Sequence, residues 1–259
     1  MNRPASWLAP EWAGGRVGAL MTSREGGLSE GAFASLNMGT SVGDEPDRVA
    51  ANRARFAAAC GAAPVFLRQV HGARVVRIGA GDARADAALH QADASLTTEP
   101  GIACTVQIAD CLPALFAAPE GRAVAAAHAG WRGLAAGVLE ATVAALCEAA
   151  RCDPGELDVW LGPCIGPRAF EVGADVLASF GVDPAHPAAS RFRPARPGKW
   201  LADLAGLARD RLAGAGVERV SGGAGCVFED QSRFFSFRRD GVTGRMAAAV
   251  WIAGPATLR

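Results

Sequence analysis

The segment from Arg122 to Leu139 constrains the fold of this chain more than any other. A short apolar run of the kind that forms a buried strand ends at His128, and Gly130 follows as a turn residue. From Trp131 onward, alanine, leucine and valine recur with helical spacing. The pattern predicts a strand, a turn and a helix, with His128 at the join. Such joins often carry chemistry because the first N–H groups of the helix can bind an anion, and Arg132 would add a positive charge beside them.

The composition indicates a globular protein that acts on a small substrate. The 259 residues include 26 basic and 26 acidic side chains, and half of all residues are hydrophobic. This charge balance argues against nucleic acid or an acidic membrane surface as a partner. No internal repeat and no long linker divides the sequence, so we expect one compact domain over residues 1–259.

The cysteine content and the absence of long apolar runs predict the compartment. Seven cysteines occur without the paired spacings of a disulfide scaffold, which favours a reducing environment. No apolar run approaches the roughly 20 residues that span a bilayer. Residues 1–12 lack the apolar core of a signal peptide. We therefore expect a cytoplasmic protein that does not bind membranes, and we favour a monomer.

Strands and helices alternate in the hydrophobic pattern. Strands are predicted over residues 16–22, 64–70, 74–78, 93–98, 102–108, 114–118 and 157–161. Helices are predicted over residues 44–60, 131–150 and 200–214, with a short one after residue 173. Residues 234–239 and 245–252 are predicted to form a terminal β-hairpin around an Asp-Gly turn. Two irregular stretches, 79–91 and 183–197, contain His90 and His186 without an evident partner.

A long glycine-rich loop follows the first predicted strand, over residues 23–39. Loops of this kind often carry function, so Arg24 and Asn37 are candidates for ligand contact, with a plain surface turn as the alternative. The loop lacks both the GxxxxGK and the GxGxxG patterns. Binding of a nucleoside triphosphate or a dinucleotide is therefore not supported.

Three nitrogen or sulfur donors, His71, Cys111 and His128, each fall at the end of a predicted strand next to a turn. Strand ends of one sheet can meet at one edge, and two histidines with one cysteine leave a fourth tetrahedral position open, as in a catalytic zinc site. Copper accepts the same donors. Taken singly, a turn histidine is more often structural, and a free cysteine is usually a small buried hydrophobe. Asp110 and Pro113 beside Cys111 favour a functional interpretation.

Ten segments carry a family resemblance along nearly the whole chain. They include Gln-Val-His-Gly at 69–72, Asp-Cys-Leu-Pro at 110–113 and His-Ala-Gly-Trp-Arg-Gly at 128–133. The others lie at 22–27, 35–37, 43–44, 52–53, 92–94, 161–167 and 235–240. In this order they resemble the purine nucleoside phosphorylase family, formerly described as laccase-domain or polyphenol oxidase proteins.

The resemblance implies an α+β fold, a metal centre and an activity. The fold would be mixed β-sheets packed together with helices on the outside, in four α/β/β/α-like layers. Zinc, with copper as the alternative, would be bound by His71, Cys111 and His128. The activity would be phosphorolysis of adenosine, inosine, guanosine and S-methyl-5'-thioadenosine, with some adenosine deamination. Purine nucleosides and phosphate would thus be the partners of this site.

Phosphorolysis also needs an anion site, and our hypothesis is that Arg132, the helix N-terminus and Arg24 hold the phosphate. Asn37 and Gln69 are the further candidates for substrate contact. Deamination rests on the resemblance alone, because the H-x-E and P-C-x-x-C signature of the zinc deaminases is missing.

Other functions stay open at this point. A Cys/His hydrolase would use Cys111 as nucleophile and His71 or His128 as base, as in relatives linked to correcting cell-wall precursors. A copper-dependent polyphenol oxidase is disfavoured, because multicopper sites need about ten histidines, and this chain has 4. A non-enzymatic partner protein has no heptad, charged tail or repeat to support it. Cys164 lies in a Gly-Pro-rich loop and could approach the metal centre, although a small residue in a tight turn is the simpler interpretation.

Overall fold

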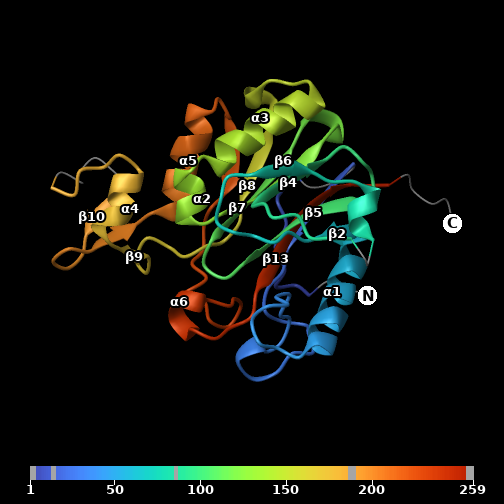
Figure 1. The fold of residues 1–259 in the computed structure, drawn as a ribbon, viewed down its shortest axis with the longest axis horizontal. Coiled ribbons are helices and arrows are strands. Elements are labelled where there is room, and N and C mark those ends of the chain that lie inside the picture. Colours follow the sequence, from blue (N-terminus) through green and yellow to red (C-terminus); the bar gives the residue numbers. More distant parts are fainter. Residues whose placement is uncertain (1–3, 13–15, 85–86, 186–190, 255–259) are drawn as a thin grey trace.

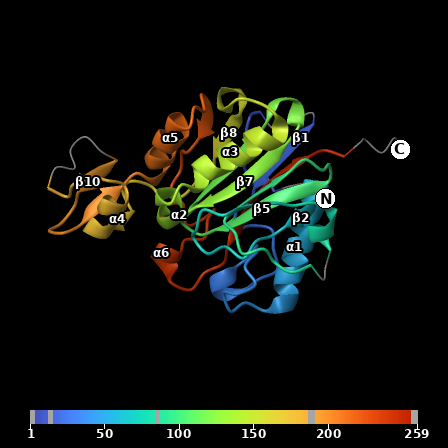
Figure 2. The same ribbon diagram turned by 45° about the horizontal axis from the view of Figure 1, so that its top comes forward.

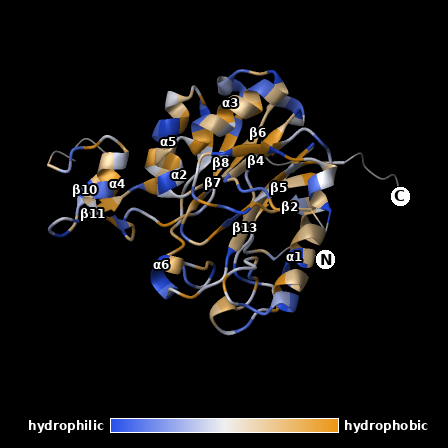
Figure 3. Ribbon diagram, in the orientation of Figure 1, coloured by the Kyte–Doolittle hydropathy of each residue, from blue (hydrophilic) through white to orange (hydrophobic). Residues whose placement is uncertain are grey.

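The structure is a computed structural model, and it describes residues 4–12, 16–84, 87–185 and 191–254. Two β-sheets pack face to face, with helices on both outer sides (Figures 1 and 2). The apolar residues concentrate in the central strands (Figure 3). This arrangement of helix, sheet, sheet and helix confirms the predicted α+β class with layered mixed sheets.

The smaller of the two packed sheets has four strands. Their order is β1-β13-β5-β2, formed by Val17–Met21, Met246–Ile252, Ile102–Ile108 and Ala63–Val65. Helix α1, Pro46–Cys60, covers the outer face through Phe56 and Cys60. The helix ends where Gly61 adopts a left-handed backbone with φ of 63°, which glycine accommodates without steric cost.

The larger sheet has six strands in the order β12-β8-β6-β7-β4-β3. These strands are Arg219–Gly222, Asp158–Leu161, Leu112–Ala117, Val124–Ala129, Ala94–Thr97 and Val75–Arg77. Its outer face is covered by α3, Val138–Ala150, and α5, Leu204–Gly214. The neighbouring strands β6, β7 and β4 are antiparallel.

Strand β7 is buried on both faces, which explains its continuous apolar run. Side chains alternate across a strand, so Ala125 and Ala127 face the helices while Val124 and Ala126 face the other sheet. The same alternation places His128 toward the other sheet, at the end of β7. The fold thus points this side chain into the space between the two sheets.

A third, small sheet projects from the body together with α4, Ala174–Ser179 (Figure 1). Its strands are β10, Phe192–Pro194, β11, Trp200–Ala202, and β9, Glu171–Val172. The prediction of irregular structure over 183–197 is therefore wrong for β10. The predicted helix over 200–214 begins only at Leu204, because Asp203 caps it by accepting a hydrogen bond from the N–H of Gly206.

The predicted helix over 131–150 is two helices, α2, Trp131–Ala135, and α3. The break lies at Gly137, whose φ of 89° is incompatible with a continuous right-handed helix. The spacing of apolar residues continues across the break, so periodicity alone does not reveal it.

The predicted terminal hairpin is wrong. Residues Phe237–Asp240 form the short helix α6, in which the Ser236 hydroxyl accepts a hydrogen bond from the N–H of Arg239. Strand β13 pairs instead with β1 and β5, which are distant in sequence. The Asp-Gly pair ends a helix here, with Gly241 at φ of 69°.

Strand β12 lies outside the predicted elements, and the 3₁₀ helix Ala80–Ala83 occupies part of the predicted irregular stretch 79–91. No helix among the described residues has the length and apolar character needed to cross a membrane.

Replacing Gly137 with alanine tests the cause of the helix break. An added Cβ would meet only Glu140 Oε2, at an ordinary 3.8 Å, so the cost comes from the left-handed backbone. We expect Gly137→Ala to lower the free energy of unfolding by about 1 kcal/mol or more in denaturant titrations. Gly214→Ala is the matched control, because Gly214 lies in α5 with open space around it, and it should be neutral or slightly stabilising. Equal effects of the two variants would contradict this explanation.

Candidate metal centre and active site

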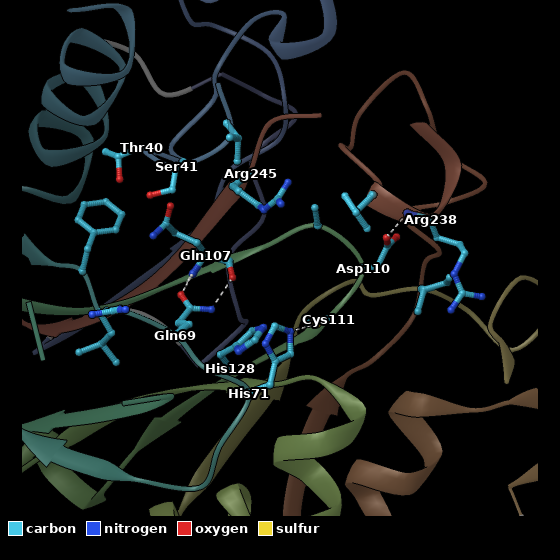
Figure 4. Close-up of a pocket in the computed structure, with 18 of the residues that line it drawn as sticks. Thr40, Ser41, Gln69, His71, Gln107, Asp110, Cys111, His128, Arg238 and Arg245 are labelled. Atoms are coloured by element: carbon cyan, nitrogen blue, oxygen red, sulfur yellow. Dashed lines mark hydrogen bonds between the residues drawn. The ribbon is translucent and has the colours of Figure 1, made fainter. Parts of the chain in front are cut away.

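A cavity of about 620 Å³ opens beside the ends of the two packed sheets, and Figure 4 shows most of the residues that line it. His71, Cys111 and His128 lie together on one wall. One ligand atom from each can be chosen so that all three lie within 4.8 Å of one another. The sequence grouped these three residues because each falls at the end of a predicted strand, and the structure places them together.

Adjacent strand ends position two of the three side chains. His128 is the second-last residue of β7 and pairs in register with Pro113 of β6, and Cys111 immediately precedes β6. The N–H of His128 donates to the carbonyl of Asp93 in the neighbouring chain segment, at 2.7 Å. Pro113 lacks an N–H, and it is accommodated near the point where the pairing between β6 and β8 ends.

His71 comes from the loop between β2 and β3, where its backbone adopts a left-handed φ of 60°. Its Nε2 lies 3.7 Å from the Sγ of Cys111, and its ring meets that of His128 edge to face at 4.8 Å. Gly130 makes this approach possible, because a Cβ there would lie 2.9 Å from the Sγ of Cys111 and 2.8 Å from the ring of His71.

Asp93 holds the two histidines in place. Its buried carboxylate accepts hydrogen bonds from the N–H groups of Val70, His71 and Gly72, at 3.1, 2.8 and 2.8 Å. It is also 2.9 Å from the Nδ1 of His128. Burial alone would raise the pKa of this carboxyl, but the hydrogen bonds, led by that from His128, lower it below its ordinary value.

The pairing with Asp93 decides which nitrogen of His128 faces the cavity. A carboxylate on Nδ1 favours the proton there, which leaves Nε2 directed toward Cys111 and His71. Sequence reasoning placed Asp93 at the start of a strand and in a segment of the family resemblance, but it missed this role. An acidic residue directly before a fully buried strand, 22 residues after a candidate ligand, was the available signal.

Cys111 and His128 form a mutually charged pair. Burial opposes ionisation of the Cys111 thiol, but the charge of His128 and hydrogen bonds from His128 and His71 lower its pKa to about 6. Burial likewise opposes charging of His128, yet the Cys111 thiolate and the Asp93 carboxylate raise its pKa to about 9. The geometry therefore favours a thiolate at neutral pH, which is the form of cysteine that binds metals.

The residues present fit a bound metal ion. Two imidazole rings and one thiolate supply three donors, and Asp93 orients one ring from behind, as outer carboxylates do in zinc sites. Three protein donors would leave a further coordination position free for a substrate. Zinc and copper both accept this donor set.

The other predicted contact residues lie in different environments. Gln69 lines the cavity, but its amide is bound to the backbone of Gln107, donating to the carbonyl at 2.9 Å and accepting from the N–H at 2.7 Å. Arg24 donates to the carbonyls of Ala34 and Gln231, at 2.8 and 3.1 Å. Within the described part of the chain, Arg24 does not line the cavity.

Arg132 and Asn37 are also outside the cavity lining, as far as the described residues show. Arg132 is exposed at the start of α2, with its guanidinium 4.2 Å from the centre of the Trp131 ring. Asn37 is fully buried, and its amide binds the backbone of Gly39 and of Arg245. Asn37 thus holds chain segments together rather than facing a ligand.

Cys164 does not join the metal cluster found among the described residues. It is buried, forms an isolated β-bridge with Cys226, and its pKa is raised by burial. His90 has a partner after all, since its Nε2 lies 2.6 Å from Asp82. His186 lies outside the described residues.

The lowered pKa of Cys111 predicts its reactivity in metal-free protein. Because the thiolate is the nucleophile, alkylation by iodoacetamide should rise through a midpoint near pH 6, where an ordinary cysteine would need a pH near 9. Peptide mapping at about pH 7 should find Cys111 modified before Cys60 and Cys104, whose pKa values burial raises to about 12. His128→Ala should move the midpoint upward. A midpoint above pH 8 in the unaltered protein would contradict the ion pair.

A family model described as "Multi-copper polyphenol oxidoreductase laccase" matches residues 18–253. Purine nucleoside phosphorylase PA4543 of Pseudomonas aeruginosa is 50% identical over 250 residues, covering 95% of this chain and 98% of the relative. Purine nucleoside phosphorylase YfiH of Escherichia coli is 45% identical over 248 residues, covering 95% and 98%.

Solved structures agree with these sequence matches. Neisseria meningitidis protein NMB0706 superposes with a TM-score of 0.87 at 45% identity, over 96% of this chain and 100% of the other. YlmD from Geobacillus stearothermophilus also gives 0.87, at 35% identity over 98% of both chains. The predicted family is thereby confirmed: the chain belongs to the YfiH-like purine nucleoside phosphorylases.

Proposed function

We propose that this protein is a metal-dependent purine nucleoside phosphorylase, which transfers a ribosyl group from a purine base to phosphate. The names of its relatives support this reaction. The observation that carries it is the charge of the cavity. The chain as a whole has as many acidic as basic side chains, yet the described residues that line the cavity beside the metal cluster include four arginines and one aspartate.

The cavity would select an anion together with a neutral nucleoside. Its arginines are Arg53, Arg68, Arg238 and Arg245. Asp110, the one acidic side chain among the described lining residues, already accepts hydrogen bonds from the hydroxyl of Ser236 and the N–H of Arg238, both at 2.6 Å. An excess of guanidinium groups with little opposing charge is the environment in which a phosphate is stabilised.

The size and the apolar walls of the cavity suit a purine nucleoside. A volume of about 620 Å³ lies within the range of small-molecule sites. Trp131 and Phe237 offer aromatic surface for a purine ring, and Phe237 is 56% exposed. We propose adenosine, inosine, guanosine and S-methyl-5'-thioadenosine as substrates.

The reaction needs a positioned phosphate and stabilisation of the charge that develops as the base leaves. Guanidinium groups would hold the phosphate toward C1' of the ribose while the departing purine takes the bonding electrons. His71, Cys111 and His128 would hold zinc, or copper, which would supply a Lewis acid beside the substrate. Asp93 keeps the Nε2 of His128 directed into the site throughout.

A Cys/His hydrolase is the second candidate, and one observation favours it. Cys111, His128 and Asp93 are arranged as nucleophile, base and orienting carboxylate, and the pKa of the thiol is lowered to about 6. In that case an acyl group would accumulate on Cys111 when muropeptide-like amides are offered, and mass spectrometry would detect it. Zinc bound through Cys111 in the active protein would exclude this use of the thiol.

A product assay tests the proposed function. With adenosine and phosphate, we expect adenine and ribose 1-phosphate, and no adenine when phosphate is omitted. Inosine formed from adenosine would reveal deamination in the same chromatogram. Cys111→Ala should lose the metal and lower kcat/KM by more than about 100-fold. This loss is larger than the one expected when only a residue that hydrogen-bonds to a metal ligand is replaced.

Cys147→Ala is the matched control, because this partly buried cysteine in α3 is not among the residues that line the cavity, and the variant should retain activity. Metal analysis of both variants accompanies the assay. Phosphate-independent cleavage, or full activity in metal-free Cys111→Ala, would contradict the proposal.

A further inference from the structure

One wall of the cavity carries hydrogen-bond donors that the protein itself leaves unused. Thr40 and Ser41 lie on the exposed loop before α1, and Figure 4 shows them near Arg245 and away from the metal cluster. Within the described residues, neither hydroxyl makes a hydrogen bond to protein. These groups are therefore free to bind a ligand in the cavity.

Strand geometry places Arg245 and Gln107 side by side on this wall. Arg245 immediately precedes β13, and Ala247 two residues later pairs in register with Gln107 of β5. Because side chains alternate across a strand, Arg245 and Ala247 share a face, and Gln107 is the diagonal neighbour of Arg245 on that face. Figure 4 shows the Gln107 side chain directed away from Gln69, on the side of Thr40 and Ser41.

Hydrogen bonds from one nitrogen, Nη1, to the backbone hold the guanidinium group of Arg245 in place. Its Nη1 donates to the carbonyls of Thr243 and Gly244, at 3.0 and 3.1 Å. Among the described residues, neither Nε nor Nη2 of Arg245 has a hydrogen-bond acceptor. Two fixed N–H-bearing nitrogens of one guanidinium form the planar fork that binds a phosphate or carboxylate bidentately.

Asn37 fixes the two halves of this wall relative to each other. Its Oδ1 accepts from the N–H of Gly39 at 2.8 Å and from the N–H of Arg245 at 2.9 Å. Its Nδ2 donates to the carbonyl of Gly39 and to Asp44, at the other end of the loop. A Cβ on Gly39 would lie 2.9 Å from the Cγ of Arg245, so only glycine allows the loop to pack on the arginine stem.

The other three arginines of the cavity lie in different surroundings. Arg53 donates from Nε to the carbonyl of Met38 and stacks on the Phe66 ring at 3.9 Å. Arg238 donates to the carbonyl of Glu171. Arg68 is exposed. Arg53 and Arg245 are both partly buried, and burial lowers the pKa of each, but strand pairing places Arg245, and not Arg53 of α1, beside Gln107. A bound anion would favour the charged form of Arg245.

We propose that Thr40, Ser41, Gln107 and Arg245 form the subsite for a phosphoryl group, which is inorganic phosphate in the phosphorolysis proposed above. Hydroxyl, carboxamide and guanidinium donors on one wall suit the several oxygens of a tetrahedral dianion. Its role in binding phosphate as the co-substrate rests on the proposed function. Asn37 is the positioning residue of this subsite. It replaces Arg132 as the anion site.

The test compares Arg245→Gln and Ser41→Ala with the unaltered protein. At saturating inosine, Arg245→Gln should raise the KM for phosphate by about 10- to 100-fold. This change corresponds to the binding free energy of one or two charge-assisted hydrogen bonds. Ser41→Ala should raise it by a few fold, because a neutral hydroxyl contributes about 1 kcal/mol. The KM for inosine should change by less than about twofold in both variants. Ser41 is exposed, so its replacement leaves folding intact.

Arg48→Gln is the charge control, since Arg48 lies on α1 and pairs with Glu30 at the surface. It should leave both KM values unchanged. If Arg132→Gln raises the KM for phosphate and Arg245→Gln leaves it unaltered, the proposed subsite is overturned. The phosphate would then be assigned to Arg132 and the N-terminus of its helix.

Calorimetric titration with inorganic phosphate in the absence of nucleoside separates this proposal from the proposed function. Weaker phosphate binding by Arg245→Gln supports the subsite even if no phosphorolysis occurs. Phosphorolysis with an unaltered phosphate affinity in Arg245→Gln overturns the subsite alone. Inosine 5'-monophosphate is the second probe: if Arg245→Gln weakens its binding but not that of free phosphate, the phosphoryl group belongs to a nucleotide and the assignment to inorganic phosphate fails.

Discussion

The Asp93 carboxylate is the contact on which the rest of the site depends. One buried group accepts hydrogen bonds from three consecutive N–H groups of the loop that carries His71 and pairs with the ring of His128. A buried carboxylate without partners would cost several kcal/mol, so the loop and the ring must both be in place for the chain to fold around it. The folding of the chain and the assembly of the candidate metal centre are therefore coupled through Asp93.

The two packed sheets supply the rigid frame for this centre and for the cavity. His128 and Cys111 are delivered by neighbouring strands of the larger sheet, whereas Gln107 and Arg245 are delivered by neighbouring strands of the smaller one. In each pair one residue lies within a strand and the other immediately precedes a neighbouring strand. The metal cluster and the proposed phosphate subsite thus face a common cavity from two different sheets, and a nucleoside bound between them would contact both.

Sequence reasoning recovered the parts of this account that depend on local pattern. His128, Cys111 and His71 were grouped because each follows a predicted strand, and the structure places their ligand atoms together. The terminal hairpin was wrong because pairing between distant strands decides the partners of β13, and no local signal encodes that choice. Gly137 divides a continuous apolar pattern for a reason visible only in its backbone angle.

Polar residues that act through long-range contacts were the hardest to predict. Asp93 lies next to a buried strand, and Arg245 next to another, so both resemble ordinary strand boundaries in the sequence. Arg132 attracted attention because it follows His128, yet its side chain is exposed on α2. Asn37 was a candidate for ligand contact, and the structure places its side-chain amide among backbone groups.

Zinc titration of Asp93→Asn against a competing chelator tests the central claim most directly. The substitution keeps the size of the side chain but removes the charge that orients His128, so zinc affinity should fall by roughly 10- to 100-fold. Asp82→Asn, which alters the other His–Asp pair at the surface, is the control and should bind zinc as the unaltered protein does. Unchanged zinc affinity in folded Asp93→Asn would show that Asp93 does not organise the metal centre.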